Sequence, residues 1–316
     1  MIRPRIGITL GDPGGVGPEV TLKSLASLSS LPDARYILFG SQNVIENERN
    51  ALNLDRSFLH DSISLHEIDC LPGPVERGRP TLPNGAVSFR YFERAVQEAQ
   101  EGNIQAIVTA PVSKHSWDLA GIPWAGHTEY LSQFYPEAIM FFWAADLKVA
   151  LFTHHLPLRQ AIEKIKDKSL LEFILRLHAN MNKIISHSFE FLVSGLNPHA
   201  GENGLMGSEE REQILPAIEK ARLNGVPISG PFPPDVVFRH ALNKPDKIVI
   251  ALYHDQGLIP FKLQAFERGV NLTIGLPFVR TSPDHGTAFD IAGKGIADPT
   301  SMIEAIRLAH QFATAL

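Results

Sequence analysis

The sequence predicts an α/β protein built from two α/β/α domains that flank a cleft. Apolar runs of strand length alternate with longer helical patterns, which is typical of sheets whose strands are joined by helices. Several runs, such as residues 248–252, are apolar at every position and therefore suit strands buried on both faces of a parallel sheet. The length of 316 residues is enough for two hydrophobic cores.

The chain begins with a predicted strand at residues 6–10 and a glycine-rich turn, GDPGGVGPE, that opens a helix. The turn is not a dinucleotide-binding fingerprint, because counting from Gly15 places Val20 where the third glycine belongs. No Gly-Lys-Ser/Thr of a Walker loop follows it either. Its glycines fit two interpretations equally well: a turn that needs positive φ, or a backbone segment that approaches a ligand.

A strand–helix–strand unit comes next. Residues 36–40 are predicted to form a strand, whereas residues 41–83 show no regular pattern. Apolar positions recur along one face of residues 86–101, and another strand follows at residues 104–109, so this part predicts a βαβ unit and a parallel sheet. The later predicted elements are helices at residues 159–183, 209–223 and 300–312 and a strand at residues 270–274.

The composition excludes several classes of protein. The net charge is -5 and no basic run occurs, so neither nucleic acid nor an anionic membrane is an expected partner. The single cysteine, Cys70, excludes an intramolecular disulfide framework and is expected to be a small core residue. The N-terminus lacks the pattern of a signal peptide, and the longest apolar run, residues 138–145, is too short to span a bilayer. We therefore expect a cytoplasmic protein.

Three histidines follow three largely apolar runs, just past the predicted carboxyl end of each strand. If these strands are parallel neighbours, three imidazoles converge on one edge of one sheet, which predicts a metal site with an open position for substrate. Each histidine alone could be structural, and the pattern does not separate His155 from the adjacent His154. The three candidates are His155 after residues 149–152, His199 after residues 189–193 and His254 after residues 248–252.

Two acidic residues could support this metal site. Asp255 and Glu202 are suited to accept the remaining ring N–H of a metal-binding histidine and so to fix its tautomer. Each also has an ordinary alternative, since Asp255 could cap a turn and Glu202 could be a solvated loop residue. A divalent metal in this setting can acidify a substrate hydroxyl and stabilise an enolate.

Other polar residues are candidates for binding an anionic substrate. Lys262 and Arg280 are possible cationic partners, with Asn271 between them in the sequence, although such residues are more often surface cations. His127 and Thr128 follow a glycine and could bind phosphate, but Thr128 could equally cap a helix.

Several motifs together resemble the 4-hydroxythreonine-4-phosphate dehydrogenase family of pyridoxal-phosphate biosynthesis. They are GDPGGVGPE, TAPVSK, GHTEYL, THHLPL, GLNPHAGE, YHDQG and RGVNLTIGLPFVRTSPDHGTAFDIAGKG. The last of them, continued to HGTAFDIAGKGIADP, also resembles the nucleotide-binding stretch of isopropylmalate and isocitrate dehydrogenases. The resemblance implies the fold of those enzymes, with a discontinuous first domain (residues 1–130 and 268–316), a second domain (residues 131–267), and a homodimer whose active site lies at the subunit interface.

The resemblance also implies roles for individual residues. It places the metal ligands on His155, His199 and His254, and so favours His155 over His154. It places substrate binding on His127, Thr128, Lys262, Asn271 and Arg280. In the mechanism that we expect, Lys262 also moves a proton, and Asp255 is the second catalytic residue because it supports the metal. It places the nucleotide on Asp290 and Gly293, where the acid would favour NAD over NADP by repelling a 2′-phosphate.

The implied reaction is an NAD- or NADP-dependent oxidation that uses one divalent metal ion per subunit, zinc, cobalt or magnesium. The expected substrate is the small phosphorylated amino acid 4-phosphohydroxy-L-threonine, whose 3-oxo product decarboxylates to 3-amino-2-oxopropyl phosphate. Leu205 departs from the family pattern, which leaves open a sister dehydrogenase acting on a threonate- or erythronate-type acid. The alternatives of another class are a metal-dependent phosphate-ester hydrolase and a non-catalytic oligomer held together by metal.

Overall fold

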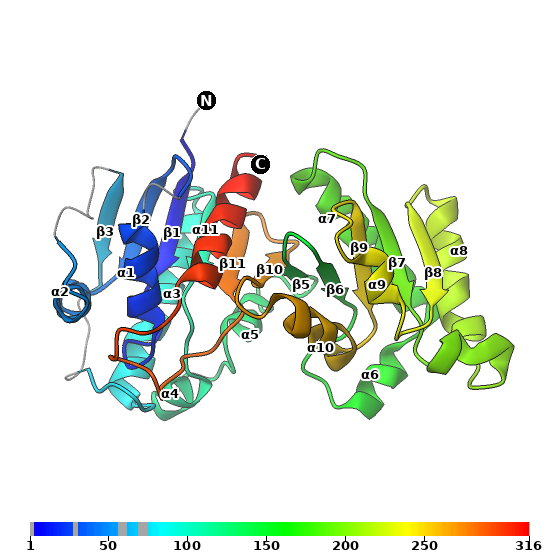
Figure 1. Cartoon of the computed structure of the whole chain (residues 1–316), viewed down its shortest axis with the longest axis horizontal. Coiled ribbons are helices and arrows are strands. Elements are labelled where there is room, and N and C mark those ends of the chain that lie inside the picture. Colours follow the sequence, from blue (N-terminus) through cyan, green and yellow to red (C-terminus); the bar gives the residue numbers. More distant parts are fainter. Residues whose placement is uncertain (1–2, 28–30, 56–61, 69–74, 316) are drawn as a thin grey trace. The chain divides into compact units, whose positions relative to one another are not determined.

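The computed structural model describes residues 3–27, 31–55, 62–68 and 75–315 (Figure 1). The chain forms two compact units: unit 1 comprises Met1–Ala138 and Leu276–Leu316, and unit 2 comprises Ile139–Gly275. The domain boundaries expected from the sequence lie after residues 130 and 267, and the boundaries between the two units of the structure lie after residues 138 and 275. Cys70, expected in a core, lies outside the described residues.

Unit 1 contains a sheet in which the described strands pair in parallel. The pairing explains the burial, because β1 and β4 lie inside the sheet and all but the first residue of β1 are buried. The predicted strands at residues 36–40 and 104–109 correspond to Arg35–Gly40 and Ala106–Thr109 and the predicted helix lies before the second of them, although another strand, Ile63–Glu67, comes between the first strand and the helix. The strand order is β3 (Ile63–Glu67), β2 (Arg35–Gly40), β1 (Arg5–Thr9), β4 (Ala106–Thr109) and β11 (Val279–Pro283).

Helices cover both faces of this sheet, with α1 and α11 in front of it and α3 behind it in Figure 1. The helix α3 begins where the Thr81 hydroxyl accepts a hydrogen bond from the backbone N–H of Asn84, and it buries an apolar face that includes Val87 and Tyr91. The helices are α1 (Gly17–Ala26), α2 (Gln42–Ala51), α3 (Leu82–Gln100), α4 (Lys114–Leu119), α5 (His127–Leu131) and α11 (Thr300–Ala313).

The expectation that residues 41–83 lack regular structure is wrong, because this stretch contains α2 and β3. Both elements have weak sequence signals. Only Val44, Ile45 and Glu48 are buried in α2, so its apolar face is narrow. The strand β3 is short, pairs among the described strands with β2 alone, and exposes most of its residues.

Unit 2 contains a mixed sheet. Strands β5 and β6 are antiparallel, and β10 pairs antiparallel with β5. The strands β6, β9 and β7 are parallel neighbours, which confirms the arrangement predicted for the three strands that precede the histidines. The strand order is β10 (Val270–Ile274), β5 (Ile139–Trp143), β6 (Lys148–Leu151), β9 (Lys247–Ala251), β7 (Glu190–Ser194) and β8 (Ile228–Phe232).

The core of unit 2 packs α9 (Val237–Ala241) and α10 (His254–Ala265) against this sheet, with Phe142 and Phe261 in contact near its centre. Two helical segments are more divided than expected. The predicted helix at residues 159–183 is two helices, α6 (Leu158–Lys164) and α7 (Asp167–Ile184), because Ile165 leaves the helical conformation and is buried. The predicted helix at residues 209–223 begins with a π-helical turn, Glu210–Ile214, before α8 (Leu215–Leu223).

Among the described residues, no helix has the length and apolar character needed to cross a bilayer.

Candidate functional site

The glycine-rich turn after β1 is packed tightly against protein backbone. Gly11 has φ +68°, and a Cβ on it would lie 2.3 Å from the carbonyl oxygen of Pro111. A Cβ on Gly15 would lie 2.7 Å from the carbonyl oxygen of Thr287, which also accepts a hydrogen bond from Val16. Neighbouring backbone and positive φ therefore account for these glycines, which favours the first of the two interpretations of the motif.

Asp12, in the same turn, is fully buried. Its carboxylate accepts hydrogen bonds from the backbone N–H of Gly14 at 2.8 Å and from the hydroxyl of Ser116 at 2.6 Å. Burial raises the pKa of Asp12, although these hydrogen bonds act in the opposite direction. The residue thus fixes the turn to α4 at the carboxyl end of the sheet of unit 1.

A buried cation lies at the same end of this sheet. Arg280 on β11 is 3% exposed, and its Nη2 donates a hydrogen bond of 2.7 Å to the Thr109 hydroxyl at the end of β4. The same Nη2 lies 3.1 Å from Nδ1 of His127, the first residue of α5. Burial lowers the pKa of Arg280 to about 10, so the guanidinium remains charged at neutral pH.

The protonation state of His127 follows from this contact. A guanidinium has only N–H donors, so Nδ1 of His127 must be the acceptor and the ring proton must lie on Nε2. Burial, and to a smaller extent the charge of Arg280, holds the pKa of His127 well below its usual range. Nε2 is buried with no hydrogen-bond partner among the described residues, and the ring packs edge-on to Phe92 and Trp117. His127 is therefore a neutral donor beside a buried cation.

Two of the three candidate metal ligands lie together in unit 2. The ring centroids of His155 and His254 are 5.7 Å apart. His254 begins α10, and its Nδ1 lies 2.6 Å from the Asp255 carboxylate, so Nδ1–H donates to Asp255 and, in the neutral ring, Nε2 is the nitrogen with the lone pair. His155 is exposed and has φ +47°, a conformation that is uncommon outside glycine.

His199 lies in a loop of unusual backbone conformation after β7. From His199 to Asn203 every residue has positive φ, and His199 itself is exposed. The loop is held by Glu210, a buried acid that the sequence analysis missed. Its carboxylate accepts hydrogen bonds from the backbone N–H groups of Leu196 and Asn197 at 2.8 and 2.7 Å. No sequence signal marked it, because burial of an acid is rare and a sequence pattern does not display it.

The residues described in one chain contain no group of three His, Cys, Asp or Glu side chains placed to hold a metal ion. The pair His155 and His254 fits a divalent ion, because the donor atoms are imidazoles and Asp255 fixes the tautomer of one of them. His199 is not brought into the same group. Glu202 is exposed on the His199 loop.

The remaining candidates are divided between the units. Lys262 is half-buried on α10 and Asn271 lies on β10, where its Oδ1 is buried without a hydrogen-bond partner among the described residues. In unit 1, Thr128 is half-buried on α5 and Asp290 is exposed. Gly293 has φ +76°, and a Cβ on it would lie 3.0 Å from the side chain of Arg77.

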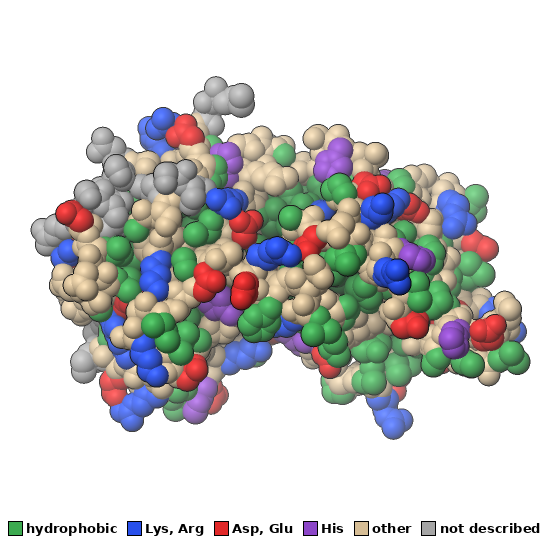
Figure 2. All heavy atoms as spheres, in the orientation of Figure 1, with side chains coloured by type: hydrophobic (Ala, Val, Ile, Leu, Met, Phe, Trp, Pro, Cys, Tyr) green, Lys and Arg blue, Asp and Glu red, His purple; other side chains and the backbone are tan. Residues whose placement is uncertain are grey.

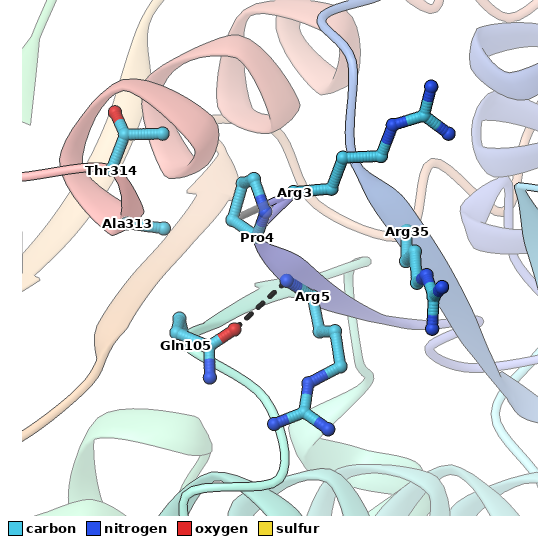
Figure 3. A pocket seen from close by; sticks show the side chains of 7 residues that line it. All are labelled: Arg3, Pro4, Arg5, Arg35, Gln105, Ala313 and Thr314. Atoms are coloured by element: carbon cyan, nitrogen blue, oxygen red, sulfur yellow. Dashed lines mark hydrogen bonds between the residues drawn. The ribbon is translucent and has the colours of Figure 1, made fainter. Parts of the chain in front are cut away.

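One cavity lies near the histidine segment that follows β6, and another lies in unit 1, apart from the candidate residues. A cavity of about 400 Å³ in unit 2 is lined by His154 and Leu156, the residues on either side of His155 in the chain, and by residues of α6 and α7. A cavity of about 760 Å³ lies at the amino-terminal end of β1 and β2, where three arginine side chains extend in different directions (Figure 3). Its lining contains none of the candidate residues: it comprises Arg3, Pro4, Arg5, Arg35, Gln105, Ala313 and Thr314.

Solved structures support the fold. A 4-hydroxythreonine-4-phosphate dehydrogenase from Klebsiella pneumoniae superposes with a TM-score of 0.85 at 36% identity, covering 98% of this chain and 99% of that chain. A beta-decarboxylating dehydrogenase from Thermococcus kodakarensis gives a TM-score of 0.52 at 15% identity, covering 97% and 81%. The second likeness concerns the fold alone, and it confirms the expected decarboxylating-dehydrogenase fold.

Sequence comparisons place the chain in a family. Residues 32–309 match the family model described as pyridoxal phosphate biosynthetic protein PdxA. The chain is 40% identical to a 4-hydroxythreonine-4-phosphate dehydrogenase from Desulforapulum autotrophicum, over 99% of this chain and 96% of the relative. It is also 40% identical to a D-threonate 4-phosphate dehydrogenase from Cupriavidus necator, over 98% of both chains. The chain therefore belongs to the PdxA family of pyridoxal phosphate biosynthetic proteins.

Proposed function

We propose that the protein is a metal-dependent NAD(P) dehydrogenase that oxidises 4-phosphohydroxy-L-threonine to 2-amino-3-oxo-4-phosphooxybutanoate. That product decarboxylates to 3-amino-2-oxopropyl phosphate, a step of vitamin B6 biosynthesis. The observation that carries the proposal is the buried guanidinium of Arg280 beside the neutral donor His127, because such a pair suits an anionic group of a small substrate. The name of the Desulforapulum relative and the fold support the same reaction.

The residues of this chain have distinct roles in the proposed reaction. Arg280, with His127 and Thr128, binds the phosphate or the carboxylate, and the binding energy aligns the reacting carbon. Asn271 hydrogen-bonds the substrate through an amide whose Oδ1 has no partner among the described residues. Lys262 moves a proton to or from the substrate.

The metal and the nucleotide occupy different parts of the chain in this proposal. His155 and His254 hold the divalent ion, with Asp255 orienting His254. When bound, the ion supplies Lewis-acid chemistry that lowers the pKa of the substrate hydroxyl, and the nicotinamide accepts the hydride. Asp290 and Gly293 contact the adenosine side of the nucleotide, with Asp290 favouring NAD.

A second copy of the chain completes the site in this proposal. The three segments that carry the candidate metal ligands all expose large apolar side chains, and Figure 2 shows hydrophobic side chains over α6 and α10. Such exposure around candidate ligands suits a surface covered by a partner subunit, which would bring the third imidazole. The exposed residues are Leu156 (40%) and Leu158 (55%) after His155, Leu205 (84%) and Met206 (45%) after His199, and Ile259 (61%) and Leu263 (85%) after His254.

A second candidate substrate is D-threonate 4-phosphate, which is favoured by the name of the Cupriavidus relative at the same identity. As their names state, both substrates carry a phosphate at position 4, and they differ in the presence of an amine. Arg280 and His127 can bind an anionic group of either molecule, so the contacts around Arg280 do not discriminate between the two substrates.

One assay tests the proposal. The purified protein is incubated with NAD or NADP and each of the two substrates, with and without a chelator, and reduced nicotinamide is followed by absorbance. We expect reduction with at least one substrate and its loss on chelation, restored by zinc or cobalt. Release of inorganic phosphate without any nicotinamide reduction would replace the dehydrogenase with a hydrolase.

A further inference from the structure

The hydroxyl of Thr109 accepts a hydrogen bond from the buried guanidinium of Arg280. Thr109 is the last residue of β4 and is fully buried. In the parallel pairing of β4 with β11, Arg280 lies opposite Ile107, so Thr109 lies two residues further along on the same face of the sheet. The side chain of Arg280 therefore extends toward the carboxyl end of the sheet, where it meets the Thr109 hydroxyl.

The two contacts of Arg280 Nη2 fix the orientation of the guanidinium. The nitrogen carries two hydrogens and has two acceptors, Thr109 Oγ1 at 2.7 Å and His127 Nδ1 at 3.1 Å. Two acceptors on one nitrogen define the rotation of the planar group. Thr109 does this as a neutral acceptor and adds no negative charge of its own, while Glu129 nearby favours the charged form of Arg280.

The orientation of Arg280 has a consequence for His127. The N–H that is not directed at Thr109 is available for Nδ1 of His127, and this contact requires the ring proton to lie on Nε2. Loss of the Thr109 contact would remove one of the acceptors that orient the guanidinium and would weaken the constraint on the tautomer.

We propose that Thr109 is a positioning residue for anion binding: its hydroxyl holds the Arg280 guanidinium, and through it the Nε2–H tautomer of His127, in the arrangement that receives an anionic group of the substrate. The identity of that substrate rests on the proposed function, whereas the hydrogen-bond relay does not. The ligand chemistry is a phosphate or carboxylate group.

The test compares two substitutions at one position. Thr109→Val removes the hydroxyl at nearly constant volume, and Thr109→Ser keeps it. The matched control is Thr281→Val, which removes a buried hydroxyl of β11 that donates to the carbonyl oxygen of Ala305 and is not bonded to Arg280. Thermal unfolding of all variants reports any general loss of stability.

The first measurement does not require turnover. Nitrogen-15 NMR of histidine-labelled protein identifies the protonated ring nitrogen of His127, and titration with inorganic phosphate gives a dissociation constant. We expect wild type, T109S and T281V to hold the Nε2–H tautomer, T109V to show a mixture of tautomers, and phosphate affinity to fall about tenfold in T109V alone, since a charge-assisted hydrogen bond is lost.

The second measurement uses steady-state kinetics with the substrate that the protein accepts. We expect KM to rise about tenfold in T109V while kcat changes about threefold or less, with T109S close to wild type, because the contact aids binding rather than the chemical step. An unchanged tautomer and phosphate affinity in T109V, or an equal loss in T281V, would overturn the proposal. Failure of the proposed function alone would show as no turnover by wild type with the NMR and phosphate results intact.

Discussion

The protonation of His127 shows how burial decides the chemistry of a single residue. The ring lies beside Phe92 and Trp117 and against the charge of Arg280, so a second proton on it is strongly disfavoured in the folded protein. In the unfolded chain the ring regains an ordinary pKa near about 6.5. The folded state therefore binds fewer protons than the unfolded state in the acidic range, and stability must depend on pH there.

Substitution of His127 by Gln tests this dependence. Because the folded pKa is depressed, the stability linked to His127 is fully present above the unfolded pKa and is lost as the pH falls below about 6.5. Wild type should therefore lose more stability than H127Q between neutral and mildly acid pH, measured by urea unfolding at several pH values. The control is His187→Gln at an exposed position, which should follow wild type. Parallel curves for wild type and H127Q would show that the ring is protonated in the folded state.

The positions of the three candidate histidines were predictable from the sequence because they depend on short-range signals. An apolar strand followed by a histidine within a few residues predicted the placement of His155, His199 and His254 after β6, β7 and β9, and the parallel order of those strands was confirmed. The contacts of Thr109 were not predictable, because the hydrogen bond to Arg280 joins residues 171 positions apart. No local pattern encodes such a pair.

At the scale of elements, the loop that carries His199 depends on the helix that follows it. Glu210, in the first turn after Ser208, accepts two backbone hydrogen bonds from residues 196 and 197, and a Cβ on Gly201 would lie 2.7 Å from its Oε2. A carboxylate that receives several N–H donors makes charge-assisted bonds, which are the stronger kind. The left-handed run from His199 to Asn203 is uncommon for residues other than glycine and requires such external support.

Glu210→Gln should loosen this loop specifically. We expect a loss of about 1–3 kcal/mol in the free energy of unfolding and faster amide exchange at residues 196–204, because the charged acceptor becomes a neutral amide. Hydrogen exchange read by mass spectrometry measures the effect. Glu212→Gln, an exposed acid in the same turn, is the matched control and should leave the exchange of the loop unchanged. Equal protection in both variants would show that Glu210 does not hold the loop.

The elements that were missed or merged in the sequence-based prediction have weak or misleading patterns of apolar residues. The helix α2 and the strand β3 bury few residues, so their periodicity is faint. By contrast, α3 and α11 bury broad apolar faces; α11 was predicted nearly to its ends, and α3 was predicted apart from its first turn. The break between α6 and α7 lies at Ile165, whose apolar side chain continues a helical pattern although its backbone is extended. An apolar residue in the sequence indicates a buried position, but it does not indicate where a helix ends.

At the scale of the whole molecule, the exposed apolar side chains of unit 2 argue for association. Helix α10 exposes Ile259, Leu263 and, just after its end, Phe266, which recur at helical spacing. If α10 lies in the proposed dimer interface, Leu263→Glu should shift the protein from dimer to monomer, measured by light scattering after gel filtration, and should lower the content of the proposed metal. Leu223→Glu on α8 is the control, because Leu223 is as exposed (88%) but lies away from the histidine segments in the sequence. A dimer that persists in L263E would place the interface elsewhere.

The proposed division of the candidate ligands between subunits yields the sharpest test of the proposed metal site. His155 and His254 lie together within one chain, whereas no described group of three includes His199. If a partner supplies His199, a hybrid dimer of His199→Ala and His254→Ala subunits has one intact site and one site that lacks both residues. By the two-fold symmetry of such dimers, the purified hybrid should have about half of the wild-type activity and metal content, although both parent proteins have neither. A hybrid of His155→Ala and His254→Ala is the matched control: these two residues come from the same chain, so each of its sites lacks one ligand and it should remain inactive. Activity in the second hybrid and none in the first would mean that His155 and His254, rather than His199 and His254, come from different subunits.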